Sequence, residues 1–114
     1  MHSDSTCLFC NIVSGDIPST KVYEDDRCLA FLDVNPLAPK HFLVVPKNHL
    51  ASAAEISPEN EADIGHIFSV IAKLTAEQGM ESFRVVTNCG ADAGQTVQHL
   101  HFHVLGGQTL GSFN

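Results

Sequence analysis

The sequence has no tryptophan, a single tyrosine and only six lysines and arginines among its 114 residues. With 13 acidic residues the formal net charge is −7, which argues against polymeric nucleic acid and anionic membrane surfaces as partners. No apolar run approaches the roughly 20 residues that a transmembrane helix needs. Residues 1–6 lack the basic and apolar parts of a signal peptide, so we expect a cytoplasmic protein.

Cysteine is also scarce. The four cysteines could form two disulfides, but the thiols of a cytoplasmic protein are mostly reduced. Hydrophobic residues make up 44% of the chain, as in a globular core, and the length is that of one ordinary domain. We find no internal repeat and no low-complexity linker, so the sequence predicts a single domain over residues 1–114.

Histidine, in contrast, is concentrated near the C-terminus. His99, His101 and His103 alternate with apolar residues, which is the pattern of a strand. The pattern predicts that the three imidazoles share one face of a sheet and the apolar residues the other. A row of imidazoles suits proton transfer and nucleophilic attack on phosphorus. The alternatives are three structural histidines, or a zinc site in which a His-x-His pair gains a third ligand.

A Cys-x-x-Cys pair, Cys7 and Cys10, lies near the N-terminus. Such a pair is half of a zinc site or a redox pair, and the simpler alternative is two reduced thiols packed beside a helix. The apolar residues around the pair have helical spacing, which predicts a short helix ending near Gly15.

The remaining pattern predicts strands and one long helix. Ser57-Pro58-Glu59 is typical of a helix start, and apolar residues at helical spacing continue to about Gly79. His66 lies off the apolar stripe, and we expect it on the solvated surface. Strands are predicted at 20–24, 28–32, 41–46 and 83–87 and through the histidine stretch, the first two as a hairpin. The fold class is therefore α+β with a mainly antiparallel sheet.

Several motifs together resemble a known family. The segment 99–105 matches the histidine-triad motif, and the similarity extends through 94–97, 29–33 and 38–47. The chain resembles the nucleotide-binding branch of the histidine triad (HIT) superfamily from about residue 7 to residue 107. The resemblance implies one HIT domain with a short tail at 108–114. It also implies a curved antiparallel sheet of about five strands with one long and one short helix. Two copies would form a homodimer with a continuous sheet.

The resemblance also implies an activity. The enzyme would hydrolyse purine nucleoside 5′-phosphoramidates, or related derivatives of AMP or GMP, through a nucleotidyl-histidine intermediate and without an organic cofactor. His101 would be the nucleophile, and His103 would contact the phosphate and the leaving group. His99 would lie behind them, and His41 would support the triad. A dinucleoside polyphosphate hydrolase and a largely non-catalytic nucleotide- or protein-binding module remain alternatives.

The same resemblance assigns binding residues. Asp33 would accept hydrogen bonds from the ribose hydroxyls, with Val34 against the sugar, although Asp33 could instead simply cap its loop. The residues implied around the phosphate are Asn88, Gly94, Gln95 and Thr96. The apolar slot for the base would consist of Leu8, Phe9, Ile12, Ile17, Phe31 and Leu43.

Relatives that carry this Cys-x-x-Cys pair hold zinc. The resemblance therefore implies a closed structural Zn²⁺ site made by Cys7, Cys10, His49 and His99. The C-terminal tail departs from the family pattern because it contains neither tryptophan nor proline. This departure leaves the substrate preference open.

Overall fold

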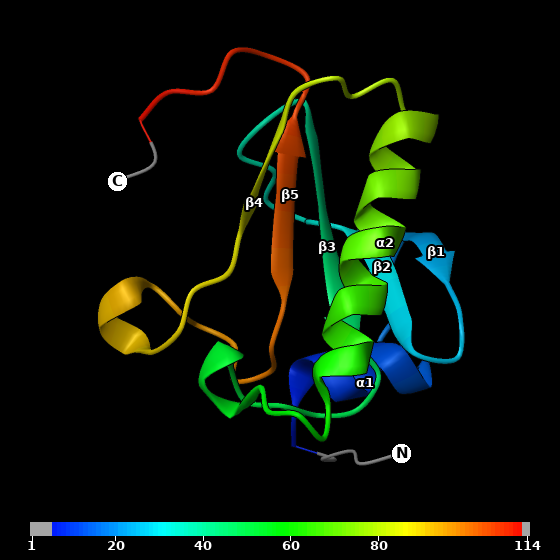
Figure 1. Ribbon diagram of the computed structural model, residues 1–114, viewed down its shortest axis with the longest axis vertical. Helices are drawn as coiled ribbons and strands as arrows, with labels where there is room; N and C mark the ends of the chain where they lie inside the picture. The colour runs from blue at the N-terminus through cyan, green and yellow to red at the C-terminus, as the bar shows by residue number, and fades with distance from the viewer. Residues whose placement is uncertain (1–5, 113–114) are drawn as a thin grey trace.

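The computed structural model describes residues 6–112 (Figure 1). Along this part of the chain the elements are α1 (Leu8–Ser14), β1 (Lys21–Glu24), β2 (Cys28–Leu32), β3 (Lys40–Pro46), the 3₁₀ helix η1 (Ala53–Glu55), α2 (Glu61–Glu77), β4 (Phe83–Val86), the 3₁₀ helix η2 (Ala91–Ala93) and β5 (Phe102–Gly106). The expected domain, 1–114, and its tail, 108–114, extend beyond the described residues. No helix within 6–112 is long and apolar enough to cross a membrane.

Within the described residues the five strands form one antiparallel sheet in the order β1-β2-β3-β5-β4. The last strand in the sequence, β5, lies between β3 and β4 (Figure 1). It is therefore hydrogen-bonded on both sides, and β3 occupies the centre of the sheet. The predicted α+β class with an antiparallel sheet is confirmed.

Both faces of the central strands are covered. Ala30 of β2 and Val44 of β3 belong to the core beneath α2, whereas their neighbours Phe31 and Leu43 pack with α1 on the opposite face. Strands buried on both faces read as nearly continuous apolar runs, which explains the composition of β2 and β3. The sheet thus carries a large core on one face and a smaller cluster with α1 on the other.

Helix α1 has defined caps at both ends. The Cys7 sulfur accepts a hydrogen bond from the backbone N–H of Cys10, 3.3 Å away. Gly15 ends the helix at φ +89°, in the left-handed region that glycine adopts without steric cost. The predicted end of this helix near Gly15 is confirmed.

The predicted start of α2 is wrong by several residues. Ser57, expected as the N-cap, lies in a turn in which its hydroxyl accepts from Glu59 N–H. Asn60, at φ −126°, is the last residue before the helix, and its side chain accepts from Ser57 N–H. The serine and asparagine side chains therefore stabilise a turn, and α2 begins only at Glu61. The end of α2, at Glu77, agrees with the predicted stop near Gly79.

His66 also differs from expectation. It is half-buried, and its Nε2 atom lies 2.6 Å from Asp25 Oδ2. This contact joins α2 to the turn between β1 and β2.

The histidine stretch is only partly a strand. Because β5 begins at Phe102, His99 and His101 precede it. Their segment is held by other partners: Leu100 N–H donates to Leu50 O (2.6 Å), and Thr87 Oγ1 donates to His101 O (2.8 Å). The alternation of faces nevertheless persists, since Leu100 and Phe102 lie in the core beneath α2. His99 and His101 instead contact Phe9 of α1.

Candidate active site

A cavity of about 840 Å³ opens on the face of the sheet that α1 covers. Its apolar wall includes Leu8, Phe9, Ile12, Phe31 and Leu43. Its polar residues include Asp33, Asn88, Thr96, His101 and His103, and Gly94 lies beside them. Val34, 89% exposed, lies at the rim, and Ile17 packs in the α1 cluster without lining the cavity. The cavity therefore has one side suited to a flat apolar ring and another suited to a polar or anionic group.

The orientation of His101 is set by the backbone of His99. Its Nδ1 atom lies 2.7 Å from the carbonyl oxygen of His99. A carbonyl can only accept, so in the neutral imidazole Nδ1 carries the proton and Nε2 has the lone pair. Phe9 holds the ring edge-on, with centroids 5.1 Å apart. His101 lines the cavity, and its unprotonated ring nitrogen is Nε2.

The partly exposed His103 is paired with the buried His41. His41 Nε2 lies 2.9 Å from His103 Nδ1, and His41 Nδ1 accepts from the backbone N–H of Leu37, 3.0 Å away. Burial lowers the pKa of His103 to about 4, and the nearby His101 and His41 act in the same direction. Burial also lowers the pKa of His41, although the carboxylate of Asp33 opposes this effect. Both imidazoles are therefore neutral at neutral pH.

Asp33 has two different environments for its two oxygens. Oδ1 accepts from the backbone N–H of Asn35 at 2.8 Å, so one oxygen does cap the loop. Oδ2 lies 3.4 Å from His41 Nε2 and 3.9 Å from His103 Nδ1. The loop cap thus occupies one oxygen and leaves the other beside the histidines.

The loop before the histidine stretch is shaped by Gly94 and Gln95. Gly94, at φ +93°, closes η2, and Asn88 Nδ2 donates to Ala93 O at 2.7 Å. Gln95 does not line the cavity, in contrast to its assignment around the phosphate. Its buried amide accepts from Gly90 N–H and donates to Ala51 O and Val97 O. Three backbone partners turn this side chain inward, so that it supports the loop.

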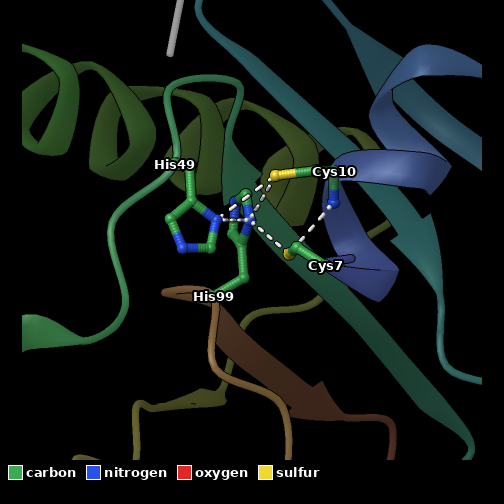
Figure 2. Close-up of side chains that lie close together, drawn as sticks. All are labelled: Cys7, Cys10, His49 and His99. Carbon is green, nitrogen blue, oxygen red and sulfur yellow. Dashed lines mark hydrogen bonds between the residues drawn. The ribbon is translucent and has the colours of Figure 1, made fainter. Parts of the chain in front are cut away.

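A cluster of two cysteines and two histidines lies at the N-terminal end of α1 and consists of Cys7, Cys10, His49 and His99 (Figure 2). The cysteines come from α1 and its cap, His49 follows β3, and His99 precedes β5. His99 Nδ1 lies 3.3 Å from Cys7 Sγ and 3.1 Å from His49 Nδ1, and His49 Nδ1 lies 3.2 Å from Cys10 Sγ. His99 is fully buried, and burial lowers its pKa to about 4.

The bonding of His99 tests whether this cluster suits a metal. Its Nε2 lies 2.9 Å from Pro46 O, so Nε2 carries the proton and Nδ1 turns its lone pair toward the sulfur atoms. Zinc–sulfur and zinc–nitrogen bonds of about 2.3 and 2.0 Å require tetrahedral ligand atoms to be about 3.3–3.8 Å apart. The donor set fits a closed zinc site, and the donor distances of 3.1–3.5 Å lie within or slightly below this spacing.

Residues 14–110 match the family model described as the HIT domain. The chain belongs to the HIT family. Among relatives of this HIT protein, an uncharacterised HIT-like protein of Synechococcus elongatus is 46% identical over 104 residues, which are 90% of this chain and 91% of that protein. The purine nucleoside phosphoramidase of Escherichia coli is 37% identical over 106 residues, covering 91% and 89%.

Solved structures of HIT-family proteins have the same fold as this chain. A histidine triad protein from Clostridium difficile superposes with a TM-score of 0.94 at 50% identity, covering 98% of this chain and 99% of that one. A HIT family hydrolase from Clostridium thermocellum gives 0.93 at 42% identity, with coverage of 96% and 97%. The chain thus resembles HIT-family hydrolases over nearly its whole length.

Two site features of this HIT protein were not predicted. Thr87 anchors the backbone of His101 through its hydroxyl, and the backbone N–H of Leu37 reaches His41. The apolar–polar alternation pointed to the histidines but carries no information on the backbone groups that orient them. Further cavity residues outside the sequence assignments are Pro18, Ser19, Thr20, Leu32, Asn35, Leu37 and Val97.

Proposed function

We propose that this HIT protein hydrolyses purine nucleoside 5′-phosphoramidates, or related nucleoside monophosphate derivatives, through a nucleotidyl-His101 intermediate. The observation that carries the proposal is the 2.7 Å contact between His101 Nδ1 and the carbonyl oxygen of His99. It leaves Nε2 with a lone pair available for attack, without the need for a base to remove a proton. The relationship to the Escherichia coli phosphoramidase supports the substrate class.

The proposed substrate pose follows the two sides of the cavity. The purine base would lie against the apolar wall formed by α1, Phe31 and Leu43. The ribose hydroxyls would donate to Asp33, and Val34 would lie beside the sugar. The phosphate would lie near His101, His103 and the loop that carries Asn88, Gly94 and Thr96.

The chemistry has two balanced steps. His101 Nε2 would form a bond to the α-phosphorus while the bond from phosphorus to the leaving amine breaks, and the amine takes up a proton from solvent. A water molecule would then attack phosphorus, lose a proton to solvent and break the phosphorus–Nε2 bond, which releases the nucleoside monophosphate and restores the imidazole. Negative charge gathers on the non-bridging oxygens, where each pre-oriented donor lowers the barrier by about 3 kcal/mol. Neutral His103 is a candidate for one such donor.

We propose that Cys7, Cys10, His49 and His99 hold a structural Zn²⁺. Two thiolates and two imidazoles leave no position for a substrate, so the ion would act only on stability. It would tie α1, which forms a wall of the cavity, to the segment that carries His101.

We also propose a homodimer through β4. Within the described residues β1 and β4 are the edge strands, and β1 is interrupted by a register shift near Lys21. Irregular edge strands resist pairing, whereas β4 is regular and Phe83 on it is 41% exposed. Light scattering on Val85→Pro, which removes one backbone donor from β4, and on Val85→Ala would test this assignment. A dimer that is unchanged by the proline contradicts it.

The central experiment measures release of amine and AMP from an adenosine 5′-phosphoramidate, together with the intact mass of the rapidly quenched protein. Wild-type protein should carry a transient added nucleotidyl group, and His101→Gly should lose both the group and the turnover. His66→Gln, which alters a histidine outside the cavity, serves as the control. Retention of most of the rate in His101→Gly overturns the nucleophile. Much faster turnover of a dinucleoside polyphosphate overturns the substrate class alone.

A further inference from the structure

A chain of hydrogen bonds beside the cavity runs from Leu37 through His41 to His103. Its first donor, a backbone N–H, fixes which atom donates and which accepts at each step. The backbone N–H of Leu37 lies 3.0 Å from Nδ1 of His41. A backbone amide can only donate, so Nδ1 of His41 must be the unprotonated nitrogen. Neutral His41 therefore carries its proton on Nε2. An imidazolium would carry protons on both nitrogens and would lose this contact.

The same polarity continues into His103. His41 Nε2 lies 2.9 Å from His103 Nδ1 and 3.4 Å from Asp33 Oδ2. Because His41 Nε2 carries the proton, it donates a hydrogen bond to His103 Nδ1. His103 Nδ1 is therefore unprotonated, and the proton of neutral His103 lies on its Nε2. His103 lines the cavity, with 22% of its side chain exposed. The chain thus ends in an N–H group on a cavity residue.

We propose that the backbone amide of Leu37 is a positioning group that fixes His103 as a hydrogen-bond donor toward the phosphate or the leaving group. The proposal rests on the proposed function for its catalytic consequence. Without the amide, His41 can adopt its other tautomer, with the proton on Nδ1. Its Nε2 would then accept from His103 Nδ1, and His103 would turn a lone pair toward an anionic phosphate.

The surrounding loop holds the amide in place. Asp33 N–H donates to His41 O at 3.2 Å, and Asp33 Oδ1 accepts from Asn35 N–H. The loop then passes through Pro36, and after Leu37 it returns to β3, which carries His41. Leu37 is 76% exposed and lies at the cavity, and its contact with His41 is made by its backbone N–H.

The direction of these hydrogen bonds also distinguishes the cluster of Asp33, His41 and His103 from the cysteine–histidine cluster as a place for a metal ion. Oxygen and nitrogen atoms of Asp33, His41 and His103 lie close enough together for a metal ion. A metal on His41 Nε2 would require the proton on Nδ1, where the Leu37 N–H already points. His99 has the opposite arrangement. Its Nε2–H donates to Pro46 O, so its Nδ1 lone pair is available to a metal ion. We therefore assign the Asp33 cluster to hydrogen bonding.

The test compares Leu37→Pro with Leu37→Ala in the full chain. Both variants lose the exposed side chain, but only proline lacks the backbone N–H. The tautomers of His41 and His103 in the free protein are read from their imidazole ¹⁵N resonances, since protonated and unprotonated ring nitrogens resonate far apart. We expect Leu37→Ala to keep the wild-type tautomers and Leu37→Pro to populate the reversed ones. Loss of one donor of this kind should reduce kcat about a hundredfold, with little change in KM.

A second pair of variants leaves the loop sequence unchanged. His41→Gln provides an amide that can donate to His103 Nδ1, whereas the carboxylate of His41→Glu can only accept. We expect the glutamine variant to keep the His103 tautomer and the glutamate variant to reverse it. This pair decides the question if Leu37→Pro does not fold.

The outcomes separate the two proposals. Wild-type tautomers in a folded Leu37→Pro overturn the inference, as do a wild-type His103 tautomer in His41→Glu and a reversed His103 with unchanged kcat. If the wild-type protein shows the inferred tautomers but does not hydrolyse phosphoramidates, the hydrogen-bond chain stands and its catalytic role falls with the proposed function.

Discussion

His101 Nδ1 and the carbonyl oxygen of His99 are 2.7 Å apart, so the proposed nucleophile and a proposed zinc ligand share one hydrogen bond. The side chain of His99 is itself fixed by Pro46 O and by the two cysteines. Phe9 of α1 contacts both imidazole rings. A change at the cysteine–histidine cluster should therefore reach the reacting nitrogen through the backbone of His99.

The first prediction concerns the metal. Protein purified without added zinc should contain about one equivalent per chain, and Cys10→Ser should lose it because Cys10 lies beside both His49 and His99. Elemental analysis and thermal unfolding measure the two effects. Cys89→Ser, at an exposed cysteine, is the matched control and should keep both the metal and the stability. Wild-type protein without zinc would contradict the proposal.

The second prediction separates the two roles of Asp33. Asp33→Asn keeps an oxygen that can cap Asn35 N–H but loses the charge offered to a ribose. Hydrogen bonds to charged groups contribute about 1.5–3 kcal/mol, so KM for a ribonucleotide substrate should rise about tenfold to a hundredfold. Turnover of a 2′,3′-dideoxy analogue and the melting temperature should change little. An unchanged KM for the ribonucleotide would mean that Asp33 acts only as a loop cap, because the asparagine keeps that cap.

The third prediction concerns pH and the contact between Asp25 and His66. Partial burial alone would raise the pKa of Asp25, but hydrogen bonds from His66, two backbone amides and Tyr23 outweigh it and hold the pKa well below the usual range. A lowered folded-state pKa stabilises the fold fully above the unfolded pKa of about 4, and this contribution is lost progressively as the pH falls from there through the folded-state pKa. Asp25→Asn should therefore cost about 2 kcal/mol near pH 7, with the cost beginning to fall below about pH 4 and still partly present near pH 3.

Urea unfolding across this pH range measures the difference. His66→Gln should give a smaller loss, because the backbone amides of Arg27 and Cys28 still bond to Asp25 Oδ1. A cost of Asp25→Asn that does not depend on pH would show that the charge of the carboxylate is not what stabilises this turn.

The fourth prediction concerns Gln95. Gln95→Ala leaves Gly90 N–H and the carbonyls of Ala51 and Val97 without their side-chain partner. Leaving such partly buried backbone groups without partners costs about 1–3 kcal/mol, so the free energy of unfolding should fall by about 2 kcal/mol. The exposed Gln98→Ala is the matched control and should remain within about 0.5 kcal/mol of wild type. Equal stability of the two variants would contradict the structural role.

Local pattern was sufficient for much of the fold. Apolar runs identified the strands β2 and β3, and Gly15 marked the end of α1, because burial and backbone conformation leave direct traces in residue type. The histidine alternation placed the imidazoles on the correct face although β5 starts only at Phe102. Residues 97–99 form a bend, and the alternation of side chains persists from Leu100 onward, where Leu50 O and the Thr87 hydroxyl hold the backbone on its way into β5.

Other features depend on partners distant in sequence. The contact between His66 and Asp25 spans 41 positions, and helical spacing around His66 gives no sign of the carboxylate opposite it. Likewise, no residue type at position 37 signals an amide that orients a histidine, since every residue except proline has one. The turn at Ser57–Asn60 followed from competition between side-chain and helical hydrogen bonds, which the start motif alone did not resolve.

The family match begins at residue 14, whereas α1 spans Leu8–Ser14. A recombinant fragment trimmed to the matched region would lose Leu8, Phe9 and Ile12 from the wall of the cavity and both N-terminal sulfur ligands. Such a fragment could retain the sheet and α2 and still fail every ligand screen. Expression vectors for this protein should therefore preserve the first helix and keep bulky purification tags away from Cys7.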